Sequence, residues 1–182
     1  EYLVSRKTDG VRYMMILDKS NTFFIDRGGR YYKLCGNLLG VNPKFYSSVT
    51  ILDGEISSNS NFKQDFTVFD VMICCGKIMA IKKNFIERYT SINDLETCSQ
   101  SIINIKRKEY LSLSLINELQ MSENGDDGLI FIPNNLHIFV GKHKLFYKWK
   151  PLDKITFDFI VGKMIINDKL HLVLFVLKYN DL

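Results

Sequence analysis

The sequence is poor in alanine and has no segment that would mark secretion or a membrane span. Among 182 residues there is one alanine, Ala80, against many Ile, Phe, Tyr, Lys and Asn residues. Alanine is the strongest helix former, whereas aromatic and β-branched residues favour strands, so the composition disfavours a helix-dominated fold. No signal peptide is visible and no apolar run approaches about 18 residues, so we expect no membrane partner.

The cysteines and histidines lack the spacing of a zinc site or of a hydrolase. Cys74 and Cys75 are adjacent and no CxxC pair occurs among the four cysteines, so we expect reduced core thiols in an intracellular protein. The three histidines are scattered among strand candidates and form no hydrolytic constellation. A P-loop and a GxGxxG motif are also absent, so any nucleotide must be bound by another device.

Length and charge are those of an ordinary globular protein. The chain suits one domain, or one domain with part of another. Hydrophobic residues make up 46% and charged residues 24%, which allows a packed core and argues against wholesale disorder. The net charge of +4 permits a polyanionic partner without requiring one. The chain begins inside an extended segment and ends in "KYNDL" after an apolar strand, so we expect it to be part of something larger.

Most of the chain has the pattern of short strands separated by turns, which predicts a strand-dominated α+β fold. The strand candidates are residues 2–6, 11–17, 22–34 (a hairpin turned by Gly28-Gly29), 49–56, 66–73, 129–133, 136–140, 144–150 and 154–178 (a meander). Residues 77–122 are expected to carry the helices, because Leu, Ile and Lys or Glu recur at helical spacing in "KEYLSLSLINELQM". A boundary near Pro151 separates two predicted domains, 1–151 and 152–182.

The stretch "KTDGVR", residues 7–12, is the first of five candidate site motifs. A lysine amine is a poor nucleophile at its ordinary pKa of about 10.4, but burial or neighbouring cations lower that value. A strand end followed by a glycine turn would hold Lys7 rigidly and return Arg12 to the same pocket, where a guanidinium suits phosphate or sugar oxygens. Seen alone, the six residues are also typical of a charged hairpin turn.

Carboxylates mark two further motifs. In "DGE", Asp53 and Glu55 lie two residues apart and therefore face one side of a strand, which suits a divalent cation or ribose hydroxyls. In "GDDGLIF", Asp126 and Asp127 directly precede an apolar strand and are candidates for metal binding. Each motif is also compatible with an ordinary polar turn at a strand end.

An aromatic strand and a lysine pair complete the set. In "FTVFDVM", Phe66 and Phe69 fall on opposite faces, so one of them can stack on a nucleobase or both can pack in a core. In "FYKWKP", Lys148 and Lys150 share one face of a strand and offer two cations to phosphates. Lysines that protect an edge strand would have the same pattern.

In this order the five motifs closely resemble the covalent nucleotidyltransferase superfamily, which contains mRNA capping guanylyltransferases and polynucleotide ligases. The resemblance spans residues 1–158. The forms "DGLIF", "KWKP" and "KITFDF" are similar to those of capping enzymes rather than ligases. "IDRGGRYY", with Arg27, and "FIERY", with Arg88, are also similar to capping-enzyme segments.

The resemblance implies an α+β nucleotidyltransferase fold (ATP-grasp-like, as in ligases) of antiparallel sheets with flanking helices, followed by the opening strands of an OB-fold. It implies an mRNA guanylyltransferase in which Lys7 forms a lysyl-N-GMP intermediate from GTP and GMP then passes to 5′-diphosphate RNA to make the GpppN cap. The implied catalytic residues are Lys7, Lys148 and Lys150. The implied nucleotide-binding residues are Arg12, Arg27, Glu55, Phe69, Lys148 and Lys150. The implied ligands of Mg²⁺ or Mn²⁺ are Glu55 and Asp127.

Two other functions remain open from the residues alone. A ligase adenylation domain would use ATP in place of GTP, and a non-catalytic RNA-binding scaffold would form no adduct. The Arg-x-Asp-Lys motif of the family's OB-fold is absent from residues 152–182. Expected partners include the transcription machinery or a triphosphatase or methyltransferase. The expected location is the nucleus for a cellular protein and the cytoplasm or virion for a viral one.

Overall fold

The chain forms two compact units, Glu1–Trp149 and Lys150–Leu182. The computed structural model describes residues 1–35, 38–58, 63–98, 101–119, 126–138, 143–157 and 159–176. The prediction of an OB-fold start in the second unit stays a prediction, and Asp158 of "KITFDF" lies outside the described residues.

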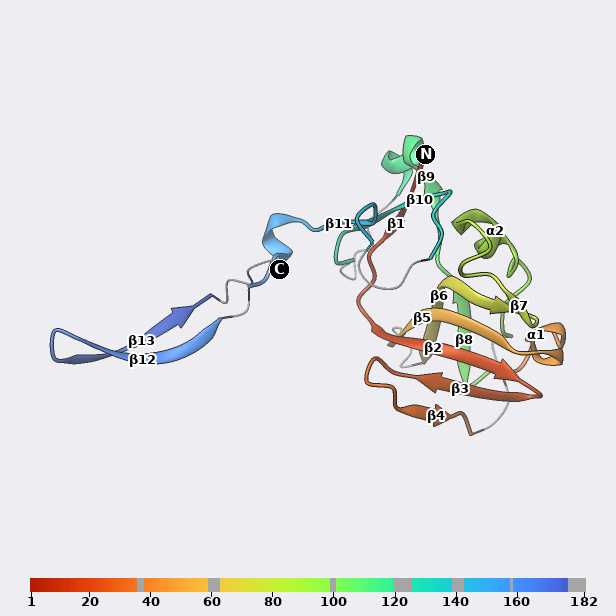
Figure 1. The fold of residues 1–182 in the computed structure, drawn as a ribbon, viewed down its shortest axis with the longest axis horizontal. Helices are drawn as coiled ribbons and strands as arrows, with labels where there is room; N and C mark the ends of the chain where they lie inside the picture. Colours follow the sequence, from red (N-terminus) through yellow and green to blue (C-terminus); the bar gives the residue numbers. More distant parts are fainter. Residues whose placement is uncertain are drawn as a thin grey trace. The chain divides into compact units, whose positions relative to one another are not determined.

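A seven-stranded sheet dominates the described part of the first unit (Figure 1). Its strands follow the order β4 (Tyr31–Lys33), β3 (Asn21–Ile25), β2 (Val11–Asp18), β5 (Thr50–Ser58), β6 (Gln64–Cys74) and β7 (Lys77–Ile78), with β8 (Ile103–Arg107) also paired to β6. The β6–β8 pair is parallel, and the other pairs are antiparallel. The hairpin predicted around Gly28-Gly29 is confirmed as β3–β4.

One face of this sheet is the hydrophobic core, because alternate residues of a strand point to the same side. The fully buried members include Met15 and Leu17 of β2, Leu52 of β5, and Phe66 and Val68 of β6. Residues at the alternate positions of these strands, such as Arg12, Asp53 and Glu55, therefore face the opposite side. That side carries the candidate site.

The four cysteines are free thiols, as expected, but they do not all lie in the core. Cys74 is buried and Cys75 is partly buried, whereas Cys35 and Cys98 are exposed. The prediction of core thiols was therefore wrong for Cys35 and Cys98. Both lie outside strands, where no alternating pattern directs a side chain inward.

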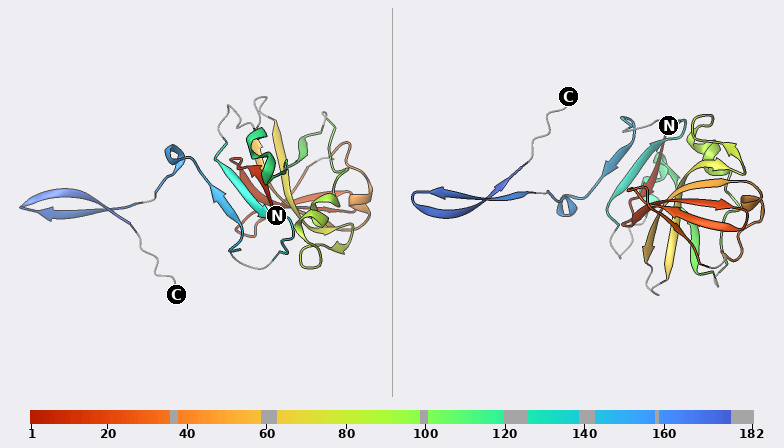
Figure 2. Two further views of the ribbon diagram at one scale, coloured as in Figure 1. Left: turned by 90° about the horizontal axis from the view of Figure 1, so that it is seen from above. Right: turned by 60° about the horizontal axis from the view of Figure 1, so that its bottom comes forward.

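A smaller sheet contains the N-terminal strand. Its order is β11 (Tyr147–Trp149), β10 (Leu129–Pro133), β1 (Tyr2–Arg6) and β9 (Leu111–Ser112), and all three pairings are antiparallel. The two views of Figure 2 agree that β1 and β10 lie side by side. Since β1 belongs to this sheet and β2 to the larger one, residues 7–10 are the direct link between the two sheets.

Helices are short in the described residues. They are α1 (Lys44–Ser47), α2 (Phe85–Thr90) and the 3-10 helices η1 (Leu113–Glu118) and η2 (Leu152–Lys154). Residues 77–122 contain α2 and η1, as expected, but the helical spacing in "KEYLSLSLINELQM" gives no α-helix in its described part, because Leu111–Ser112 pairs with β1 and the 3-10 helix η1 follows. The alternation in "LSLSL" was the relevant signal. None of the helices in these ranges is long and apolar enough to cross a bilayer.

The second unit contains a β-hairpin. Strands β12 (Ile160–Ile166) and β13 (Lys169–Phe175) pair antiparallel along their full length. Asn167 and Asp168 form the predicted turn with φ of 51° and 57°, a region that Asn and Asp tolerate better than most residues. The apolar side chains of both strands are largely exposed within this unit.

Gly54 separates the two carboxylates of "DGE" for a steric reason. A Cβ at this position would lie 2.6 Å from Phe66 Cζ and 2.6 Å from the carbonyl oxygen of Thr67. Real Cβ atoms do not approach other atoms so closely, so the glycine permits Phe66 to fill the core while Asp53 and Glu55 face the other side of β5.

We expect Gly54→Ala to lower the free energy of unfolding by about 1–3 kcal/mol, the usual cost of overpacking. Urea denaturation followed by circular dichroism measures this. Gly28→Ala is the matched control, because its Cβ would meet no atom closer than 3.3 Å. Equal stability of Gly54→Ala and wild type would contradict this account of the motif.

Candidate active site

The backbone of Lys7 continues the pairing of β1 with β10. Lys7 N donates to the Gly128 carbonyl at 2.8 Å, and Asp127 N donates to the Lys7 carbonyl at 2.7 Å. Gly128 has φ of 128°, a conformation that favours glycine and explains the "DG" of this motif. Two distant motifs are thus joined through main-chain hydrogen bonds, and Lys7 is held on a strand end as predicted.

The side chains of Lys7 and Asp127 form an ion pair. Lys7 Nζ lies 2.5 Å from Asp127 Oδ2, and the two side chains are 20% and 26% exposed. The amine is therefore oriented by a carboxylate and still reachable by a ligand. The structure places Asp127 against the nucleophile candidate rather than in a separate acidic turn.

Lys108 is a buried cation that the sequence analysis missed. Its side chain is 5% exposed, and its Nζ lies 2.8 Å from Thr8 Oγ1 and 3.2 Å from Glu55 Oε1. Thr8 also donates a hydrogen bond to Glu55. Burial lowers the pKa of Lys108, Glu55 acts against this shift, and the charge of Lys7 adds to it.

Only the tertiary fold brings Lys108 to this place. It follows β8, and its backbone N–H bonds to the Val68 carbonyl at 2.8 Å. Tyr89 of α2 donates to the Lys108 carbonyl. In the sequence, "RKEY" resembles any charged segment, so no local signal marked this lysine.

Arg12 and Asp53 form a bidentate pair on the site face of the large sheet. Arg12 Nε donates to Asp53 Oδ1 at 2.8 Å, and Nη2 donates to Oδ2. Burial raises the pKa of Asp53 while Arg12 opposes this shift, and the same hydrogen bonds raise the pKa of Arg12. The guanidinium carbon lies 5.6 Å from the ring centre of Phe69. Phe69 thus lies on the site face, whereas Phe66 is in the core.

Lys148 and Arg27 add positive charge to the same region. The pKa of Lys148 is lowered by burial and then by the charges of Lys7, Arg12 and Arg27. Arg27 also acts on the carboxyl of Asp53. Among the described residues no hydrogen bond or ion pair to Arg27 is found. A cavity of about 240 Å³ lies between Arg12 and Arg27, and Tyr13, Met14, Ile25 and Asp26 complete its lining.

Arg88 supports this region from behind. It is fully buried and donates to Asp70 through Nε at 2.7 Å and Nη2 at 2.8 Å. Its Nη1 donates to the carbonyls of Lys83 and Leu136 at 2.9 and 2.8 Å. These bonds tie α2 to β6 immediately beside Phe69, so the Asp within the aromatic strand is a structural partner of Arg88.

The carboxylates present fit one divalent cation bound together with phosphates. Glu55 contacts Thr8 and Asp127 contacts Lys7, so both reach the same two-residue segment. Within the described ranges no group of three or more His, Cys, Asp or Glu side chains forms a metal site. Mg²⁺ commonly takes one or two protein carboxylates and completes its shell with water and substrate phosphates.

Seven of the eight residues predicted for the site are arranged around the segment that links the two sheets. They are Lys7, Arg12, Arg27, Glu55, Phe69, Asp127 and Lys148. Lys150 begins the second unit, so its role beside Lys148 stays a prediction from sequence. An amine, several cations and a partly exposed aromatic ring suit a nucleotide whose phosphate is attacked by the amine.

Comparison with known proteins points in the same direction. Residues 1–152 match the family described as mRNA capping enzyme, catalytic domain. The chain is 26% identical to an mRNA-capping enzyme subunit alpha of Schizosaccharomyces pombe, covering 88% of this chain and 48% of the relative. It is 23% identical to an mRNA-capping enzyme of Caenorhabditis elegans (88% and 30%) and 25% identical to one of African swine fever virus (89% and 18%). The chain thus spans less than half of each of these relatives.

Solved structures share the fold at lower identity. The ligase domain of M. tuberculosis LigD superposes with a TM-score of 0.56 at 14% identity, covering 82% of this chain and 53% of that domain. A mycobacterial DNA ligase D gives a TM-score of 0.57 at 14% identity, covering 89% and 57%. The predicted nucleotidyltransferase fold is therefore confirmed.

The lowered pKa of Lys148 predicts proton uptake when a polyanion binds. Between that lowered pKa and the ordinary 10.5, Lys148 is partly neutral. A bound anion offsets Lys7, Arg12 and Arg27, raises the pKa again and draws a proton from solvent. Titration calorimetry with tripolyphosphate, in buffers of different ionisation enthalpy, should show uptake that grows as the pH rises into this window.

Lys148→Arg is the matched control for this measurement. It keeps the positive charge but does not titrate in this range, so it should bind the anion without the lysine-dependent uptake. The same proton uptake in wild type and Lys148→Arg would show that another group is responsible.

Proposed function

Because the chain belongs to the family of mRNA capping enzyme catalytic domains, we propose that it is an RNA guanylyltransferase that carries GMP on Lys7. The observation that carries the proposal is the Lys7 amine, held 2.5 Å from Asp127, whose charge acts together with those of Arg12 and Arg27 on Lys148. A nucleophile surrounded by cations is suited to attack on a polyphosphate. The similar proteins from a fungus, a nematode and a virus are mRNA-capping enzymes or a subunit of one.

In the first step Lys7, which is an ammonium in its ion pair with Asp127, loses one proton to solvent, and the neutral amine then attacks the α-phosphorus of GTP. An N–P bond forms, the bond from the α-phosphorus to the bridging oxygen breaks, and pyrophosphate leaves with the electron pair. Asp127 Oδ2 is close enough to Nζ to accept the amine proton. The product is a lysyl-N-GMP phosphoramidate.

Cations lower the barrier of this step because negative charge accumulates on the phosphoryl oxygens. Lys148 lies where burial and neighbouring cations make its positive charge costly, so a phosphate there relieves that cost. Lys150 is proposed to assist it. A divalent cation, held by Glu55 and Asp127, would neutralise further phosphate charge when bound.

The nucleoside is proposed to lie on the site face of the large sheet. The ring of Phe69 offers a surface on which a base can stack, and the Arg12 guanidinium stands beside it at 5.6 Å. Glu55, which contacts Lys108 and Thr8, is proposed to accept hydrogen bonds from ribose hydroxyls. Arg27 is proposed to contact the sugar or phosphates from the other side of the cavity.

In the second step a terminal phosphate oxygen of 5′-diphosphate RNA attacks the phosphorus of the adduct. A P–O bond forms, the N–P bond breaks, and the Lys7 amine regains a proton. The RNA then ends in GpppN. A separate activity must produce the 5′-diphosphate end, which is consistent with a triphosphatase partner or a further region of a longer protein.

Incubation of the protein with Mg²⁺ and GTP labelled at the α-phosphate tests the first step. We expect a labelled band after denaturing electrophoresis, its loss in Lys7→Ala, and at least a hundredfold lower labelling in Lys7→Arg, because a guanidinium stays protonated. Lys82 is an exposed lysine in the loop before α2, so the Lys82→Ala variant should be labelled to the same extent as wild type.

Three outcomes would overturn the proposal. A label that survives Lys7→Ala would place the attachment elsewhere. Labelling from ATP in place of GTP would identify an adenylation domain like that of the ligases with a similar fold. Retention of RNA binding without labelling from either nucleotide would identify a non-catalytic scaffold.

A further inference from the structure

The β3–β4 hairpin carries an exposed strip of one aromatic and two basic side chains, of which the proposed chemistry uses only Arg27. We define the hairpin strip as Arg27, Tyr31 and Lys33. Tyr31 is 77% exposed, the most exposed tyrosine in the described part of the chain, and the two basic residues are also exposed. An exposed ring beside exposed cations is a combination suited to a base and its phosphates.

Sheet register places Tyr31 on the same face as the site. Residues that pair across antiparallel strands point to one side of a sheet. The row that contains Tyr31 runs inward from the edge through Ile25, Met14 and Asp53. Asp53 holds Arg12 on the site face, so the ring of Tyr31 faces that side, about 10 Å from β2 at the usual spacing of about 4.8 Å per strand.

Lys33 belongs to the same face, since it lies two residues after Tyr31 on β4. Its register partner is Phe23, and Lys33 Nζ lies 5.9 Å from the centre of that ring. Tyr32 points to the opposite side, where it packs edge-on against Tyr13 at 6.3 Å. Tyr31 and Lys33 therefore share one side, whereas Arg30 shares Asp26 with Tyr32 on the other side. Strand β4 is the outer strand of the described sheet.

The turn of this hairpin is pre-ordered. Asp26 Oδ1 accepts hydrogen bonds from the backbone N–H groups of Gly28 and Arg30 at 2.9 and 3.0 Å. Arg30 Nε and Tyr32 Oη donate to Asp26 Oδ2 at 2.8 and 3.2 Å. Little ordering entropy remains to be lost at this turn on binding, which favours a binding role for the strip.

From these observations we propose that the hairpin strip holds the 5′ end of the acceptor RNA. Tyr31 stacks on an unpaired base near that end, and Lys33 contacts the adjoining phosphates. Arg27 of the strip also lines the cavity beside Arg12, and the charges of Arg12 and Arg27 act on Lys148 together with that of Lys7. This inference rests on the proposed function, because it names the path by which the acceptor reaches the adduct.

The chemistry of the strip favours single-stranded RNA over a protein partner. Unpaired bases are recognised by stacking on aromatic rings, with Lys and Arg along the phosphates. Arg27 and Lys33 make the strip positive, because Asp26 is already paired with Arg30 within the turn. The strip is also continuous with a pocket proposed to hold another phosphate-bearing ligand.

Equilibrium binding of a 5′-diphosphate RNA oligonucleotide, without GTP, tests the proposal on the full chain. Fluorescence anisotropy should give a Kd raised about tenfold in Tyr31→Ala and changed less than twofold in Tyr31→Phe, which keeps the ring. Lys33→Met should reduce the slope of log Kd against log salt by about 0.7, the value for one phosphate contact on a single strand.

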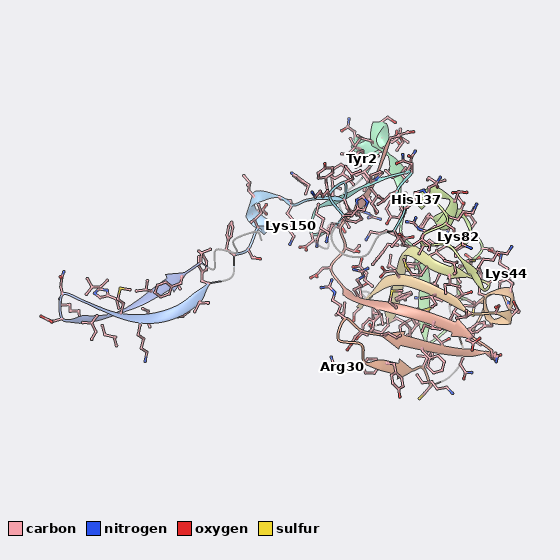
Figure 3. The ribbon with its side chains drawn as sticks, in the orientation of Figure 1. Tyr2, Arg30, Lys44, Lys82, His137 and Lys150 are labelled. Carbon is pink, nitrogen blue, oxygen red and sulfur yellow. The ribbon has the colours of Figure 1, made fainter. Side chains whose placement is uncertain are left out.

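Lys82→Met is the matched control for charge. Figure 3 shows Lys82 well apart from Arg30 of the hairpin. Lys82→Met should bind RNA like wild type, and thermal denaturation should confirm that all variants are folded. Wild-type RNA affinity in Tyr31→Ala would overturn the proposal and would point to a protein partner for the strip. Equal losses of RNA affinity in Lys33→Met and Lys82→Met would overturn it as well.

The covalent assay keeps this test separate from the proposed function. Tyr31→Ala should form the GTP-derived label on Lys7 at the wild-type level but transfer it to RNA with a KM raised about tenfold. Loss of label in wild type would count against the guanylyltransferase and leave the binding result intact. Unchanged KM and Kd in a well-labelled Tyr31→Ala would reject the strip alone.

Discussion

The antiparallel hydrogen bonds between Lys7 and residues 127–128 are the interaction on which the site depends. They extend the ladder of the small sheet to the point where the chain crosses to the large one. The backbone of Lys7 is therefore held by hydrogen bonds that continue the strand pairing. The same pairing places Asp127 beside the Lys7 amine, and the next strand of that sheet carries Lys148.

Clustering of like charges is the cost of this arrangement. Lys7 contributes to the lowered pKa of both Lys108 and Lys148, and burial of each lysine acts in the same direction. Glu55 and Asp127 offset part of the repulsion. An anionic ligand would offset more, so the like charges that repel one another here are the charges that favour a bound polyphosphate.

The positions of the strands could be predicted well because half-buried strands carry an alternating apolar pattern and the turns carry Gly, Asn or Asp. The helical pattern in residues 108–121 was misleading, because leucines at every second position fit a strand as well as one face of a helix. The pairing of Leu111 with Val4 decided for the strand. Lys108 could not be identified as a site residue from the sequence either. Its importance comes from contacts with Thr8 and Glu55, which lie 100 and 53 residues away.

The sequence by itself determined the family, because five short motifs in one order are enough for recognition although each motif is ambiguous. It also determined that Asp53 and Glu55 face one side of a strand. Only the tertiary structure decided that Asp53 binds Arg12 while Glu55 binds Lys108, and that Asp70 is taken by Arg88. Strand periodicity fixes the direction in which a side chain points, whereas its partner depends on which distant strand is packed beside it.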